Sequence, residues 1–339
     1  MNKKRVLAML LAGAMALSMT ACGGGNSAST DDSSNDGGAS ASGGSYKVSV
    51  ILKTLAAEYW QYVKSGAEDY ASEHSDKVTV EVKGPSSETA FDEMQNMIET
   101  DLSSGSYDGV VISPLQSDTA AQLVSGTKLP IVAIDTNFEA PEVKSFVGTG
   151  NEAAAKKGGE AAVEAAKAAG WTDIKCIEIA GVQGDQTNTA RMNGYKAGVE
   201  EAGGTFLSDE VQYADATADR ATTAMEAIMQ THPEGIAIIC ANNDDMAMAA
   251  ARAAQGHDAY KNTIFLGFNG DRAACEAILA GQMTMSVAQM AYEMGYKAVE
   301  TMVQVLDGET VDEFVDSGSD VVTPDNAQER LDTLKTQLH

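Results

Sequence analysis

Positive charge is scarce in this sequence. It has 23 Lys and Arg residues against 49 Asp and Glu, a formal net charge of −26. A surface of this sign repels phosphate groups, which argues against nucleic acid as a partner and against charge-driven adhesion to anionic lipid. Long apolar runs are also lacking after the N-terminus, where no segment is long enough to cross a bilayer. The hydrophobic content of 44% is nevertheless that of a globular protein, and 339 residues suffice for two domains.

Motifs for catalysis, cofactors and metals are missing as well. No GxxxxGK[ST] loop, calcium loop or nucleophile elbow is present, and the histidines do not have the spacing of metal ligands. Cys176, Cys240 and Cys275 are an odd number without a CxxC pair, which argues against a disulfide framework and a zinc site. Cys176 and Cys240 lie in strand-like runs and are expected to be buried free thiols. We therefore expect no metal, no cofactor and no enzymatic activity.

The N-terminus has the pattern of a targeting segment. Basic residues at positions 3–5 precede an apolar stretch at 6–19, which has the length of a signal-peptide core. The segment "LSMTAC" then resembles a bacterial lipobox, although Met stands where Leu is more usual. The resemblance implies removal of residues 1–21 and lipidation of Cys22. The alternative is an ordinary signal peptide followed by an incidental cysteine.

Residues 22–45 are rich in Gly, Ser and Asp. Such a tract cannot bury a core and is expected to form a flexible tether. Anchor, tether and folded body together predict a protein held at the outer face of the cytoplasmic membrane.

From residue 46 the chain alternates strand-like and helix-like segments, which predicts parallel α/β sheets with right-handed crossovers. Several strands are nearly continuous apolar runs, as expected when both faces of a sheet are covered. The alternation is too long for one sheet, and a break near 148–151 indicates two doubly wound lobes. Strands are predicted at "YKVSVIL", "KVTVEV", "YDGVVIS", "LPIVAID", "IKCIEIA", "GIAIICA" and "NTIFLGF". Helices are predicted at 58–74, 89–102, 151–169, 187–202, 217–231, 244–254 and 289–306.

Polar side chains follow four of these predicted strands. They are Lys53, Asp135, the run 242–245 and Asn269. In open parallel sheets ligands bind beyond the carboxyl ends of the strands, so these residues are candidates for a binding site. In the run 242–245 one of the two aspartates, Asp244 or Asp245, is expected to cap the following helix. Four polar residues exceed what a cap needs, which assigns Asn243 to the site.

The order and spacing of several segments resemble the periplasmic sugar-binding proteins of the ribose/galactose group, which capture the substrate of an ATP-driven importer. These segments are "KTLAAEYW", "VVISPLQSD", "PIVAIDTN", "GTGNEAAAKKGGE", "ARMNGYKAG", "THPEGIAIICANNDDMAMAAARA" and "FLGFNGDRAA". The resemblance implies a type I periplasmic-binding-protein fold, in which two lobes joined by a hinge close on the ligand. It places 45–150 with 290–318 in one lobe and 151–289 with 319–339 in the other.

The resemblance also assigns roles in ligand binding. Tyr59 and Trp60 match the aromatic pair that holds a sugar ring, and Asp135 and Arg191 match charged groups that bind hydroxyls. The remaining polar contacts match Asn243, Asn269 and Gln289. Aromatic rings suit the apolar face of a sugar, and planar polar groups suit its hydroxyls. Adjacent residues on a helix point about 100° apart, so residue geometry alone assigns at least one of the aromatic pair to the cleft.

Lys53 either reaches the ligand or pairs with Asp135 or Glu58. The chain departs from the family pattern at four positions, which leaves the identity of the sugar open. Ala57 stands where Asn is usual, Thr136 where Arg often occurs, Asn269 where Asp is usual, and Ala216 near a missing second aromatic platform.

The leading hypothesis is a monomeric binding protein that delivers a monosaccharide to the permease subunits of an ABC transporter. The main alternative is an extracellular sensor, or binder of a furanose-like signal, that reports ligand occupancy to a membrane receptor. A transcription regulator would need a helix-turn-helix and a basic face. A sugar hydrolase would need a second carboxylate paired with Asp135, for which the sequence offers no clear candidate.

Overall fold

The computed structural model describes residues 45–338. The predicted signal peptide 1–21, the lipidation site Cys22 and all but the last residue of the tether 22–45 lie outside the described residues. Within the described part, no helix has both the length and the apolar character needed to span a membrane.

The first lobe contains a parallel sheet of six strands in the order β12-β5-β4-β3-β1-β2. Its strands are β1 (Tyr46–Ile51), β2 (Val78–Lys83), β3 (Gly109–Ile112), β4 (Ile131–Ile134), β5 (Val143–Gly148) and β12 (Phe314–Asp316). Its helices are α1 (Glu58–Glu73), α2 (Phe91–Ser104), α3 (Ser117–Val124) and α9 (Ala291–Leu306). Strands β3 and β4 are buried at every residue, as their apolar runs predict.

The second lobe is built on a seven-stranded sheet in the order β13-β11-β10-β9-β6-β7, with β8 also paired to β6. All pairs are parallel except β13, which runs antiparallel to β11. Its strands are β6 (Lys175–Ala180), β7 (Thr205–Phe206), β8 (Gln212–Tyr213), β9 (Ile238–Ala241), β10 (Ile264–Asn269), β11 (Met285–Gln289) and β13 (Ser319–Val322). Its helices are α4 (Asn151–Ala168), α5 (Gln186–Glu201), α6 (Ala218–Thr231), α7 (Asp244–Ala253), α8 (Arg272–Leu279) and α10 (Ala327–Leu334), with 3₁₀ turns η1 (Ser208–Glu210) and η2 (Asp258–Tyr260).

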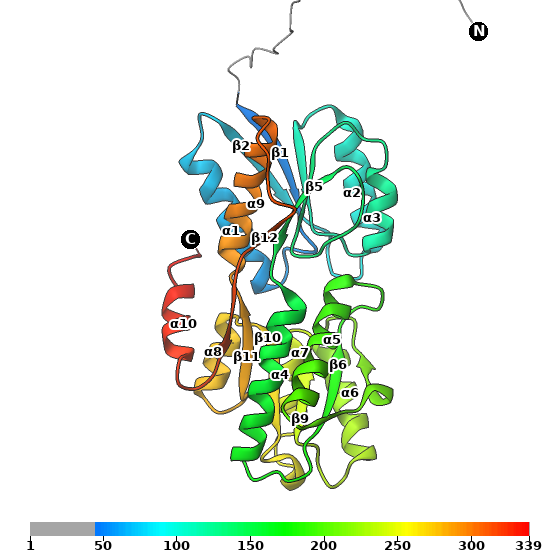
Figure 1. The fold of residues 1–339 in the computed structure, drawn as a ribbon, viewed down its shortest axis with the longest axis vertical. Coiled ribbons are helices and arrows are strands. Elements are labelled where there is room, and N and C mark those ends of the chain that lie inside the picture. The colour runs from blue at the N-terminus through cyan, green and yellow to red at the C-terminus, as the bar shows by residue number, and fades with distance from the viewer. Residues whose placement is uncertain (1–44, 339) are drawn as a thin grey trace, which may run out of the picture. The chain divides into compact units, whose positions relative to one another are not determined.

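Helix α9, far along the chain, packs on α1 of the first lobe, where Figure 1 shows the orange and blue helices side by side. Gly66 of α1 and Gly295 of α9 make this approach close, because a Cβ at either position would collide with the backbone of the other helix. The chain therefore passes between the two sheets three times, after β5, after β11 and after β12.

The two parallel-sheet lobes confirm the predicted fold class. The residue limits predicted for the lobes stay a prediction. The helix prediction needs correction in two respects. The short helices α3, α8 and α10 were not predicted. The last predicted helix, 289–306, begins only at Ala291, because Gln289 is the final residue of β11 and is fully buried there.

Candidate functional site

A polar cavity lies between the two lobes at the carboxyl ends of their strands. All eight residues proposed from the sequence line it: Lys53, Tyr59, Trp60, Asp135, Arg191, Asn243, Asn269 and Gln289. Its volume is about 60 Å³, several times the ~10–15 Å³ that one water molecule needs. The lobes thus stand close together around a small enclosed space.

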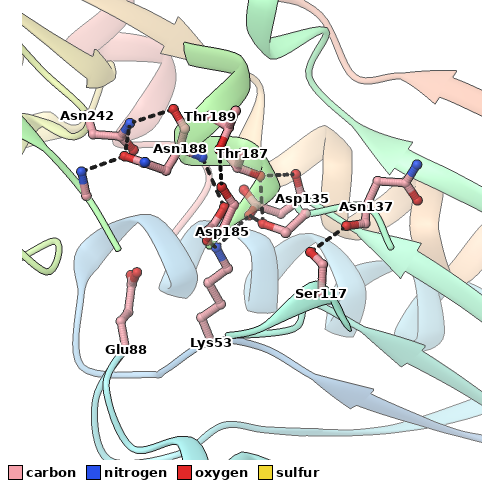
Figure 2. A network of polar contacts seen from close by, with 12 residues as sticks. Lys53, Glu88, Ser117, Asp135, Asn137, Asp185, Thr187, Asn188, Thr189 and Asn242 are labelled. Atoms are coloured by element: carbon pink, nitrogen blue, oxygen red, sulfur yellow. Dashed lines mark hydrogen bonds and ion pairs between the residues drawn. The ribbon is translucent and has the colours of Figure 1, made fainter. Parts of the chain in front are cut away.

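Lys53, at the end of β1, crosses from the first lobe to the second. Its ammonium group forms an ion pair with Asp185 at the N-terminus of α5 and lies 4.0 Å from Asp135. Figure 2 shows the side chain extended toward Asp185, with Glu88 beside it. Burial alone would lower the pKa of Lys53, but the charges of Asp185, Asp135 and Glu88 outweigh burial and raise it. The pairing of Lys53 with Asp135 that the sequence suggested is present as a long contact of 4.0 Å. The alternative pairing with Glu58 is not formed, because Glu58 pairs with Arg272 at 3.2 Å.

Asp135 is the centre of a second group of contacts between the lobes. Its two carboxylate oxygens accept hydrogen bonds from the Tyr59 hydroxyl at 2.8 Å and the Thr136 hydroxyl at 2.9 Å. Thr136 also contacts the hydroxyl of Thr187 in the second lobe at 2.8 Å, and Thr187 donates to the Asp135 carbonyl at 3.3 Å. The position where Arg is often found in the resembling family is thus filled by a threonine that joins the lobes.

Tyr59 and Trp60 both line the cavity, whereas helix geometry alone assigned at least one of them to it. They lie in the first turn of α1. Their rings meet edge to face with centroids 4.9 Å apart. The Trp60 indole donates to Glu88 at 3.0 Å, and burial raises the pKa of that carboxyl. Glu88 belongs to the loop between β2 and α2, where no sequence pattern pointed to it.

Arg191, on α5, is held rigidly in the second lobe. Its guanidinium donates to Asn151 at 2.9 Å and to the Asn242 carbonyl at 2.7 Å, and lies 3.8 Å from the centre of the Phe268 ring. Such stacking and directed hydrogen bonding preorganise a donor for a ligand oxygen. The sequence indicated Asn242 only as part of a polar run after a strand. Its amide nitrogen donates a hydrogen bond to the side-chain oxygen of Asn188, another residue of the cavity wall that the sequence did not indicate.

The helix cap after β9 differs from the one expected. Asn243, not Asp244 or Asp245, caps α7 by accepting from the Met246 amide at 2.9 Å. Its side-chain nitrogen donates to the Ala216 carbonyl at 3.2 Å. Asp244 is turned inward and accepts from Ser286 at 2.6 Å, and burial raises its pKa to about 6. Asn243 therefore lines the cavity with both ends of its amide already bonded.

Asn269 and Gln289 end neighbouring strands and are joined by a hydrogen bond of 3.0 Å from the Gln289 amide nitrogen. Asn269 has a φ of +138°, and Asp135 a φ of +62°. Such angles are unfavourable for residues other than glycine and cluster at functional sites, where surrounding structure enforces them. The wall also contains Asp185, Asp245 and Asp271, so acids outnumber bases in the cavity.

Comparison with known proteins places the chain in a family. It belongs to the periplasmic binding proteins, whose domain matches residues 48–310. It is 30% identical over 265 residues to the D-allose-binding periplasmic protein of Escherichia coli (strain K12), covering 75% of this chain and 83% of that protein. It is 26% identical over 274 residues to the ribose import binding protein of Bacillus subtilis (strain 168), covering 80% and 85%.

A solved structure supports the same fold. A carbohydrate transporter solute-binding protein from Agrobacterium radiobacter, in complex with D-arabinose, superposes with a TM-score of 0.77 at 23% identity, covering 87% of this chain and 99% of that one. These findings confirm the predicted resemblance and the two-lobed fold. The family consists of solute-binding proteins, which also confirms that the chain is not an enzyme.

Proposed function

We propose that this protein captures a monosaccharide between its lobes on the outer side of the cytoplasmic membrane and delivers it to an ABC transporter permease. The observation that supports this most directly is the enclosed polar cavity, whose walls come from both lobes and combine aromatic rings with charged and amide groups. The named functions of the relatives, D-allose binding and ribose import, favour the same ligand class.

In this proposal the rings of Tyr59 and Trp60 cover the apolar face of the sugar. Arg191 donates to its oxygens, while Asp135 accepts from its hydroxyls. Asp135 already accepts from Tyr59 and Thr136, but each carboxylate oxygen has a further lone pair. Lys53 lies in the same lobe as Asp135, 4.0 Å from its carboxylate, and binds a ligand oxygen once the ligand displaces its ion pair with Asp185. Asn243, Asn269 and Gln289 complete the wall.

Ligand entry requires the lobes to move. A cavity of about 60 Å³ has room for only a few water molecules, so a sugar enters after hinge opening at the three connections between the sheets. We place the lobe limits at 45–150 with 290–318 and at 151–289 with 319–339. Hinges of this kind guide closure along a defined path.

The binding proposal is tested by thermal shift of the full chain against pentoses, hexoses, inositols and sugar alcohols. A binder of one class should raise the melting temperature, and calorimetry then gives its affinity. Asp135→Asn should weaken binding about ten- to a hundredfold, since bonds to charged groups contribute about 1.5–3 kcal/mol. The exposed Asp118→Asn serves as the matched control. No stabilisation by any panel member would refute the proposal.

The N-terminal proposal has its own test. Lys and Arg at positions 3–5, the apolar stretch 6–19 and "LSMTAC" support cleavage before Cys22 and lipid anchoring, with residues 22–45 as tether. We infer a monomer. Mass spectrometry of the protein from its native membrane should find a diacylated or triacylated Cys22 at the new N-terminus; an unmodified terminus would contradict the anchor.

A further inference from the structure

One part of the cavity wall presents hydrogen-bond acceptors almost exclusively. It consists of Asn269, Asp271 and Gln289 and is called the acceptor wall below. The Gln289 amide nitrogen donates to Asn269 at 3.0 Å, and the Asn269 amide nitrogen donates to the Asp271 carboxylate at 3.3 Å. One N–H of each amide is thus directed along the wall, while the side-chain oxygens can receive further bonds.

Gln289 provides the observation that points to a ligand. Its side chain is completely buried and lines the cavity, yet its amide oxygen has no hydrogen-bond partner. A buried acceptor without a partner costs about 1–3 kcal/mol in desolvation. The Asp271 carboxylate fixes this arrangement, because only the NH₂ group of Asn269 can face it, which in turn directs the Asn269 oxygen to the Gln289 NH₂ group.

Among the described residues, the Asp271 carboxylate accepts a hydrogen bond only from Asn269. Asp271 occupies the N-cap position of α8, but its side chain accepts no capping hydrogen bond. It is 8% exposed and forms no salt bridge within the described residues. Burial, followed by the nearby charges of Asp244, Glu58 and Asp245, raises its pKa well above the usual range. A positively charged ligand group at this position would favour the ionised form of the carboxyl group and lower its pKa again.

Nearby cations do not neutralise the acceptor wall. Arg272 pairs with Glu58 at 3.2 Å, and Arg330 donates to the backbone carbonyls of Gly270 and Gln289. Lys53 pairs with Asp185, and Arg191 donates to Asn151 and the Asn242 carbonyl, so neither of them hydrogen-bonds a member of the acceptor wall. The wall thus contains no positively charged side chain and has more open acceptor positions than donors, so a cationic ligand group with several donors would complement it.

We propose that the acceptor wall binds a protonated primary amine, so that the ligand is an amino-substituted sugar or polyol. An ammonium group has three donors and no acceptor, whereas a hydroxyl brings one donor and no charge. Hydrogen bonds between an ammonium and a carboxylate are also about twice as strong as neutral ones. The inference rests on the proposed function, because it concerns the ligand of the same cavity.

Paired ligands that differ in one group test this inference. Calorimetry on the full chain would compare glucose, galactose, mannose and allose with their 2-, 3- and 6-amino analogues, and ribose with its 5-amino analogue, at a pH where the amines are protonated. The best amino ligand should bind at least about tenfold more tightly than its parent sugar. Asp271→Asn should reduce that preference about ten- to a hundredfold. The exposed Glu276→Gln, on the same helix, should leave the preference unchanged.

The outcomes separate the two proposals. Neutral sugars that bind as tightly as every amino analogue would overturn the amine assignment and leave the monosaccharide proposal standing. A preference for amines that persists in Asp271→Asn, or disappears in Glu276→Gln, would show that the net charge of the protein and not the acceptor wall causes it. Folded wild-type protein that binds neither class would overturn both proposals. The comparison in the wild type needs no variant, so it holds even if Asp271→Asn fails to fold.

Discussion

Glu178 offers the clearest prediction for stability. It lies at the centre of β6, is completely buried, and neither of its carboxyl oxygens has a partner that meets the geometry of a hydrogen bond. Burial raises its pKa from 4.5 to about 8, although the Asn242 amide, which lies nearby without forming a well-oriented hydrogen bond, and the charge of Arg191 counteract part of that rise. The side chains of Tyr195 from α5 and Cys240 from β9 are its other titratable neighbours.

The magnitude follows from the two pKa values. A tenfold change in proton affinity corresponds to about 1.4 kcal/mol. Because the pKa of Glu178 rises from 4.5 to about 8 on folding, keeping this side chain ionised in the folded state costs about 5 kcal/mol. The native state binds the proton more tightly than the unfolded chain. The free energy of unfolding should therefore fall as the pH rises through the window from 4.5 to about 8. For a domain whose total stability is about 5–15 kcal/mol, this is a large effect.

Glu178→Gln removes the titration and keeps the shape of the side chain. The free energies of unfolding of the wild type and Glu178→Gln can be compared by urea unfolding followed by circular dichroism at about pH 5, 7 and 9. The two proteins should have nearly equal stabilities at the lowest pH, and the variant should be more stable by several kcal/mol at the highest pH. The exposed Glu226→Gln should instead run parallel to the wild type. If the difference between Glu178→Gln and wild type does not change with pH, Glu178 is ionised or solvated in the native state and this reasoning is wrong.

Four further outcomes can be measured. Lys53→Met breaks the ion pair with Asp185 between the lobes, and calorimetry should show that it weakens binding of the best panel sugar at least about tenfold. The control Lys64→Met removes only an ion pair at the surface and should leave the affinity unchanged. Asn243→Ala removes the cap of α7 and should cost about 1 kcal/mol in urea unfolding. Asn269→Gly should be more stable than Asn269→Ala by about 1 kcal/mol, because glycine accepts the positive φ; equal stabilities would show that the angle is not strained. Small-angle scattering should show compaction when the ligand is added, and an unchanged radius of gyration at saturation would argue against the hinge.

The fold could be predicted because its strongest signals are local. Apolar runs such as β3 and β9 are buried at every residue, and amphipathic stretches such as α1 bury one face, so burial in the structure follows the pattern in the sequence. The elements that were missed are short. Strands β7 and β8 have two residues each, and helices α3 and α8 have eight, too few for a clear period. Their formation depends on packing against elements that are distant in sequence.

The cavity wall could be predicted where its residues follow or end strands and where the family resemblance assigned Tyr59, Trp60 and Arg191, but not elsewhere. Lys53, Asp135, Asn243, Asn269 and Gln289 all follow or end strands, and the sheet brings such positions to one edge. Glu88 comes from a loop and is placed by the Trp60 indole, a contact between segments 28 residues apart. Asp185 looks in sequence like an ordinary helix cap, which it is, since it accepts from the Asn188 amide at 3.0 Å. Only the fold shows that its other oxygen meets Lys53 from the opposite lobe.

Polar residues at strand ends can serve as helix caps or face a ligand, and the backbone separates the two roles. Asn243 and Asp185 cap helices from extended conformations, with φ of −144° and −79°, and their side chains bond the first helical turn. Asp135 and Asn269 have positive φ and cap no helix with their side chains. A residue held in an unfavourable conformation without a capping role keeps its side chain available for other partners. This distinction favours Asp135 and Asn269 as ligand contacts over Asn243, and it is absent from the sequence, where all of these residues are simply Asn or Asp after an apolar run.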